Sequence, residues 1–193
     1  MPYTEDILLL GSSLCNQVSR CIQESGLNID SILFKGKISL ENIKNKLIKN
    51  NKSYKKIFFI SGNNLYPSKL HKTKRGSHIC LEPFVLQECI NIYQHLLEIL
   101  EPFTDHLIFL EPPPRATKKI ENSNNCLFFD AECKNRFRTV INSLSRKINV
   151  GVLTCSTILG FLGRKELESL LSTDNIHLST LALQTIVQQV INN

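Results

Sequence analysis

The sequence has no apolar run close to the roughly 20 residues that a membrane-spanning helix requires. Its first residues, MPYTED, are acidic ahead of the first apolar run, so they lack the basic segment of a secretory signal. No internal repeat and no low-complexity linker divides the 193 residues. We therefore expect a single soluble domain over 1–193, in an intracellular, cytoplasmic protein.

Cysteine pairs of the CxxC kind are also missing. The seven cysteines are scattered along the chain, and their number is odd. This pattern argues against a disulfide framework and against a zinc site, so we expect reduced core thiols and no metal or organic cofactor. Cys15 lies two residues after Ser13, and on a helix that step turns it to another face, which argues against Cys15 as a nucleophile.

Aromatic residues are not interleaved with the basic ones, so the sequence does not support a base-stacking platform for single-stranded nucleic acid. The net charge of +6 is moderate, but its placement is uneven. These basic residues have two possible roles. They are either solvated loop side chains, or they attract an anionic substrate, a lipid headgroup surface or a nucleic-acid backbone. They form three clusters: Lys44, Lys46, Lys49, Lys52, Lys55 and Lys56; Lys69, His71, Lys72, Lys74 and Arg75; and Arg115, Lys118 and Lys119.

Hydrophobic periodicity predicts strands that alternate with helices. This alternation implies a doubly wound, flavodoxin-like α/β fold, with a five-stranded parallel sheet and helices on both faces. The segments 62–82 and 112–128 are predicted to be long polar loops after strands, at the carboxyl edge of the sheet where ligands bind in such folds. The expected strands are 6–11, 30–35, 56–61, 106–111 and 149–155, and the expected helices are 13–25, 39–50, 83–100, 129–147 and one from Ser179 to the end.

Three residues fit a Ser-His-Asp relay. Ser13 follows the apolar run 7–10 and opens an amphipathic helix, while Asp174 precedes His177 by three residues in a polar loop ahead of the last helix. In such a relay the carboxylate orients the imidazole, which takes the proton from the hydroxyl. Ser13, Asp174 and the nearby candidate Asn63 also have ordinary structural alternatives: Ser13 as a helix N-cap, Asn63 as a turn residue and Asp174 as a loop cap.

Four short blocks carry a resemblance to a known family. They are Gly-Ser-Ser-Leu at 11–14, Gly36, Ser-Gly-Asn-Asn at 61–64 and Asp-Asn-Ile-His at 174–177. In this order they resemble the blocks of the SGNH (GDSL) hydrolase superfamily, which read Gly-Asp-Ser, a Gly, Gly-x-Asn-Asp and Asp-x-x-His. The resemblance implies that Ser13 is the nucleophile, His177 the base and Asp174 its orienting carboxylate.

The resemblance also implies an oxyanion hole made by the backbone N–H groups of Ser13 and Gly36 and the side-chain amide of Asn63. Neutral donors aimed at the developing charge stabilise a tetrahedral intermediate, and an Asn amide supplies two N–H groups without a charge. The sequence departs from the family blocks at Ser12, Ser61 and Asn64, none of which is a triad position. These departures change the hydrogen bonds available to the nucleophile turn and to the Asn63 loop.

The expected function is therefore a serine esterase or deacetylase that acts on a small ester, an acylated compound or a lipid. Similar domains occur as stand-alone esterases, as carbohydrate deacetylases and in some LINE-type retrotransposons. The alternative is a binding module with weak or no catalysis, as in Oskar-like domains, which presents a basic rim to RNA or to an acidic partner. That rim would consist of Lys69, Lys72, Lys74, Arg75, Arg115, Lys118 and Lys119.

Overall fold

The main sheet has five parallel strands in the order β2-β1-β3-β6-β7, which is the predicted flavodoxin-like order. The structure is a computed structural model that describes residues 3–34, 39–60, 68–73, 76–81, 85–112, 127–145, 147–161, 163, 170 and 178–192. The strands are β1 (Tyr3–Gly11), β2 (Asn28–Leu33), β3 (Lys56–Ile60), β6 (His106–Leu110) and β7 (Asn149–Leu153). All five lie within a few residues of their predicted positions.

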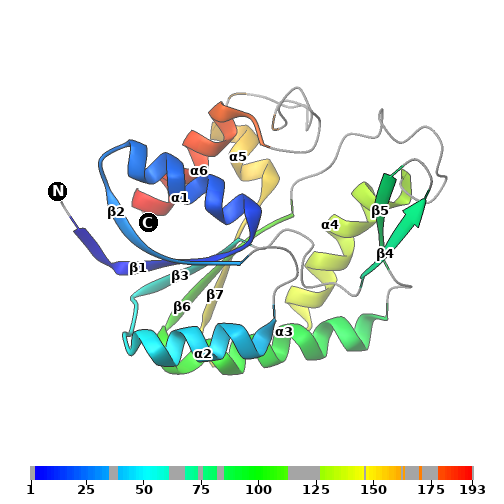
Figure 1. Ribbon diagram of the computed structural model, residues 1–193, viewed down its shortest axis with the longest axis horizontal. Coiled ribbons are helices and arrows are strands. Elements are labelled where there is room, and N and C mark those ends of the chain that lie inside the picture. The colour runs from blue at the N-terminus through cyan, green and yellow to red at the C-terminus, as the bar shows by residue number, and fades with distance from the viewer. Residues whose placement is uncertain are drawn as a thin grey trace.

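Helices cover both faces of this sheet (Figure 1). The first face carries α1 (Ser13–Glu24), α5 (Cys155–Phe161) and α6 (Thr180–Asn192). The second carries α2 (Leu40–Asn50), α3 (Leu86–Leu100) with the short 3-10 helix η1 (Glu101–Phe103), and α4 (Leu127–Asn142). Among the described residues, no helix combines the length and the apolar character that a membrane span needs.

The apolar run at the centre of β1 explains why the sheet is covered on both sides. Leu8 and Leu10 belong to the core beneath α2, α3 and α4, whereas Ile7 and Leu9 belong to the core beneath α1, α5 and α6. Successive side chains of a strand point to opposite faces, so a continuous apolar run needs a helical layer on each side. The run in the sequence therefore dictates a three-layer α/β arrangement.

Two predictions about the connections were wrong. The segment 62–82 is not a loop throughout, because β4 (Ser68–Thr73) and β5 (Gly76–Leu81) pair there as an antiparallel hairpin. A two-stranded ribbon is held by backbone pairing, so it needs no buried apolar run. Because the segment is polar, hydrophobic periodicity did not indicate the two strands. The sequence reading also missed the short helix α5 directly after β7.

Candidate functional site

Ser13 lies at the carboxyl edge of the sheet, at the point where the strand order reverses. It directly follows the turn after β1, and β1 is flanked by β2 on one side and by β3 on the other. In folds with this strand order, ligands bind at the carboxyl ends of the strands, at the switch between the first and third parallel strands. The fold therefore places Ser13 at the expected ligand-binding position.

The turn before Ser13 is tightly packed. The Ser12 N–H donates to the Ile60 carbonyl oxygen at 3.2 Å, which extends the pairing of β1 with β3 by one bond. A Cβ on Gly11 would collide with that same carbonyl and would stand 2.9 Å from the Cβ of Cys15. Position 11 therefore requires glycine, because only a residue without a side chain lets the turn approach β3 so closely.

Ser13 is not the N-cap of α1. The N-cap position is occupied by Ser12, which is buried, and Ser13 is the first residue of the helix with an exposed side chain. The first N–H groups of an α-helix have no intrahelical acceptor. They point out of the end of the helix, where they can bind an anion. The exposed hydroxyl of Ser13 thus lies beside backbone donors suited to an anion.

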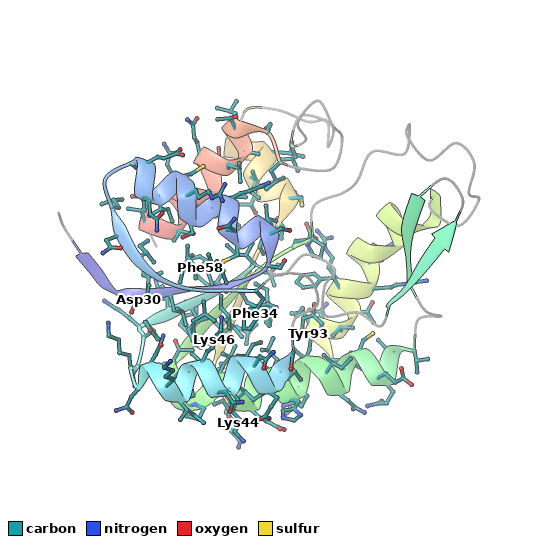
Figure 2. The ribbon with its side chains drawn as sticks, in the orientation of Figure 1. Asp30, Phe34, Lys44, Lys46, Phe58 and Tyr93 are labelled. Atoms are coloured by element: carbon teal, nitrogen blue, oxygen red, sulfur yellow. The ribbon has the colours of Figure 1, made fainter. Side chains whose placement is uncertain are left out.

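The end of the neighbouring strand β2 is held from two sides. The Phe34 N–H donates to the Gly11 carbonyl oxygen at 2.8 Å. From α2, the Lys46 Nζ donates to the Leu33 carbonyl oxygen at 3.1 Å and lies 4.7 Å from the centre of the Phe34 ring (Figure 2). A cation over an aromatic face is attracted by the electrons of the ring. These contacts fix the chain where it leaves β2, two residues before Gly36.

A buried carboxylate lies at the end of β6 and was missed by the sequence reading. Glu111 has no exposed surface, and its two oxygens accept from Arg138 Nε and from the Cys155 N–H, each at 2.8 Å. Its own N–H donates to the Leu153 carbonyl oxygen at 3.0 Å. Glu111 therefore connects β6, β7, α4 and α5 at the carboxyl edge. The only signal in the sequence was an acidic residue directly after a buried strand.

Burial makes Cys15 an unsuitable nucleophile, as predicted. It is fully buried on α1, and desolvation raises the pKa of its thiol to about 12. A thiol with such a pKa stays protonated at neutral pH and does not react as a thiolate. Cys21, Cys89 and Cys155 are also free thiols, and burial raises the pKa of Cys21 and of Cys89.

Most of the other predicted site residues lie outside the described part of the chain, so their roles stay predictions. Lys69 and Lys72 belong to β4, where they pair with Cys80 and Ser77 of β5. Within the described ranges, no three His, Cys, Asp or Glu side chains gather as metal ligands would. The residues outside those ranges are Asp174, His177, Gly36, Ser61, Asn63, Asn64, Lys74, Arg75, Arg115, Lys118 and Lys119.

Comparison with solved structures shows which proteins share this fold. An acetylxylan esterase from Geobacillus stearothermophilus is similar over 98% of this chain and 94% of its own, with a TM-score of 0.57 and 13% identity. A putative acylhydrolase from Bacteroides fragilis matches 96% of this chain and 86% of its own, with a TM-score of 0.57 and 13% identity. A GDSL-like lipase from Bacteroides thetaiotaomicron matches 96% of this chain and 87% of its own, with a TM-score of 0.55 and 10% identity.

Comparison with protein-family models and with curated protein sequences finds no match. The structural likeness spans nearly the whole chain, and at 10–13% identity it shows the fold alone. The chain thus has the fold of the SGNH (GDSL) hydrolases, which confirms the fold that the four sequence blocks predicted.

Proposed function

We propose that this protein is a serine hydrolase that cleaves an ester through an acyl-enzyme on Ser13. The observation that carries the proposal is the position of Ser13: exposed, first in α1, and at the switch point of a sheet with the fold of GDSL-type esterases. A nucleophile needs an accessible hydroxyl on a rigid element beside donors for negative charge. Ser13 meets these structural conditions.

In the proposed mechanism, His177 takes the Ser13 hydroxyl proton while Oγ attacks the acyl carbonyl carbon. The carbonyl electrons move to its oxygen, which the N–H groups of Ser13 and Gly36 and the Asn63 amide stabilise. The intermediate then collapses, the bond to the alcohol breaks, and protonated His177 gives its proton to the leaving oxygen. Water repeats these steps and releases the acid. Asp174 holds the imidazole of His177 in the tautomer that can accept the proton.

The packing around Ser13 suits this chemistry because close contacts and hydrogen bonds hold the ends of β1 and β2 in place. The turn is fixed by the contact of Gly11 with β3, and the exit of β2 toward Gly36 is fixed by Phe34 and Lys46. Donors that are already in place stabilise a developing oxyanion without reorganisation, and removing one such donor costs about 3 kcal/mol. Rigidity at these two strand ends therefore favours catalysis.

The test is Ser13→Ala, with hydrolysis of p-nitrophenyl acetate and of longer acyl esters as the readout. The variant should lose all turnover and keep the thermal stability of the wild type, because the side chain is exposed. Ser53→Ala, which changes another exposed serine, should keep full activity. A fluorophosphonate reagent should label the wild type and Ser53→Ala but not Ser13→Ala. Equal turnover or equal labelling of wild type and Ser13→Ala would contradict the proposal.

A further inference from the structure

Glu111 is a buried charge that the proposed hydrolysis does not use. Burying a carboxylate is costly unless it is paired and hydrogen-bonded, and here both oxygens are satisfied, by Arg138 and by the Cys155 N–H. The ion pair joins residues 27 positions apart in the sequence. It therefore fixes the guanidinium of Arg138 at the end of β6.

The ion pair with Glu111 uses only one of the hydrogen-bond donors of Arg138. Only its Nε contacts Glu111, while the side chain is 45% exposed. A guanidinium carries five N–H donors in a planar fork, and the contact with Glu111 uses none of the four on its terminal nitrogens. No second acceptor for Arg138 occurs among the residues that the structure describes. The buried carboxylate thus orients an arginine whose side chain is nearly half exposed.

The register of the sheet places Glu111 in the row of Ser12. Gly11 pairs with Ile60, and Phe59 pairs with Phe109, so Glu111 lies one residue beyond the level of Gly11. One strand, β3, separates β1 from β6. Because neighbouring strands lie about 4.8 Å apart, the two strand ends are separated by roughly 10 Å. Arg138 is therefore anchored on the same edge of the sheet as Ser13.

We propose that Arg138 binds a carboxylate of the substrate, so that the preferred ester carries an anionic group at a fixed distance from the bond that is cleaved. Arginine binds carboxylates through two parallel hydrogen bonds, which need the two terminal nitrogens that Glu111 leaves available. Glu111 already balances the charge of Arg138, which disfavours a dianion such as phosphate relative to a monoanion. The proposal rests on the hydrolase function for its kinetic test but not for its binding test.

The kinetic test uses mono-p-nitrophenyl esters of dicarboxylic acids of increasing length, each paired with the uncharged acyl ester of equal length. At one length, kcat/KM for the anionic ester should exceed that for its uncharged partner by about tenfold, which corresponds to about 1.4 kcal/mol. Arg138→Lys should abolish most of this preference, because an ammonium pairs with Glu111 but lacks the fork. Arg20→Gln, an exposed arginine on α1, should keep it.

Arg138→Gln alone would leave Glu111 buried without its cation and should destabilise the fold, which would confuse loss of stability with loss of binding. The double variant Glu111→Gln/Arg138→Gln removes both charges together, and it should fold, hydrolyse the uncharged esters and show no preference for the anionic ones. If the double variant or Arg138→Lys retains the wild-type preference, the proposal is wrong. The same holds if the wild type shows no preference at any chain length.

The binding test separates this proposal from the hydrolase function. The Arg138 Nε–Hε signal in nuclear magnetic resonance spectra should shift when Ser13→Ala is titrated with the monomethyl ester of suberic acid. The uncharged dimethyl ester, and inorganic phosphate at matched ionic strength, should leave it in place. A missing shift at millimolar monomethyl ester would overturn the proposal even in an active enzyme. A shift in a protein that hydrolyses no ester would support the anion site and count against the hydrolase function alone.

Discussion

The backbone of Gly11 lies so close to the carbonyl group of Ile60 that the ends of β1 and β3 have no room for a side chain between them. This contact sets the position of Ser12, whose N–H donates to the same carbonyl, and through it the start of α1 at Ser13. The stability of the sheet and the placement of the proposed nucleophile thus depend on one glycine.

Gly11→Ala should therefore lower both stability and activity. Inserting a methyl group into a well-packed site costs about 1–3 kcal/mol, and the displaced turn should also move Ser13 away from its partners. Urea denaturation and ester hydrolysis measure the two effects. Gly160→Ala is the matched control, because nothing lies within 4 Å of a Cβ at this helical position. An equal loss in both variants would show that the close contact does not matter.

Lys46→Met should loosen the exit of β2 without unfolding the protein. The substitution keeps the aliphatic stem but removes the hydrogen bond to the Leu33 carbonyl and the cation over the Phe34 ring. We expect amide hydrogen exchange to accelerate near Phe34, and turnover of a small ester to fall, because the proposed donor Gly36 follows two residues later. Lys46→Arg should restore both properties.

Lys44→Met provides the control for Lys46→Met on the same helix. Lys44 is exposed, and Figure 2 shows it on the side of α2 that faces away from the sheet. Its substitution should change neither the amide exchange near Phe34 nor the turnover. Loss of turnover in Lys44→Met as well would indicate a general effect of the basic helix rather than an anchor at β2.

The thiol of Cys15 should resist alkylation in the folded protein. Its pKa of about 12 means that the protonated, unreactive form dominates below that pH, and the thiolate fraction rises only as the pH approaches 12. Iodoacetamide at pH 8, followed by peptide mass spectrometry, should leave Cys15 unmodified until urea unfolds the chain. Rapid labelling of Cys15 under native conditions would contradict the burial on which the catalytic assignment to Ser13 partly depends.

The sequence predicted the features that local patterns determine. The run at 7–10 identified a strand buried on both faces, and the polar residues after it located the start of α1 at Ser13. The Glu111–Arg138 pair could not be predicted, because its partners are 27 positions apart in the sequence. The hairpin of β4 and β5 was missed because its strands have no long apolar run. Pairings between distant segments are set by the assembled sheet and not by local periodicity.

Asn63→Ala should lower kcat by about a hundredfold or more while KM changes little. The proposed amide donor acts on the negative oxygen of the tetrahedral intermediate, so its loss raises the barrier and leaves substrate binding intact. Asn45→Ala, an exposed asparagine on α2, is the control and should behave as the wild type. If kcat is unchanged in Asn63→Ala while Ser13→Ala is inactive, the nucleophile assignment stands and the oxyanion hole must be built from other donors.

A double-mutant cycle on Glu111 and Arg138 tests whether their ion pair is also needed for stability. Arg138→Gln should lower the free energy of unfolding by about 2 kcal/mol. This loss is smaller than the loss expected for a fully buried ion pair, because the Arg138 side chain is half-exposed, although Glu111 is fully buried. Glu111→Gln/Arg138→Gln should recover part of this loss, since no unpaired charge remains buried. Urea denaturation of the four proteins gives the coupling energy between the two side chains. Additive losses, with no recovery in the double variant, would mean that Glu111 does not depend on Arg138, and that the arginine is not held in place by the buried carboxylate.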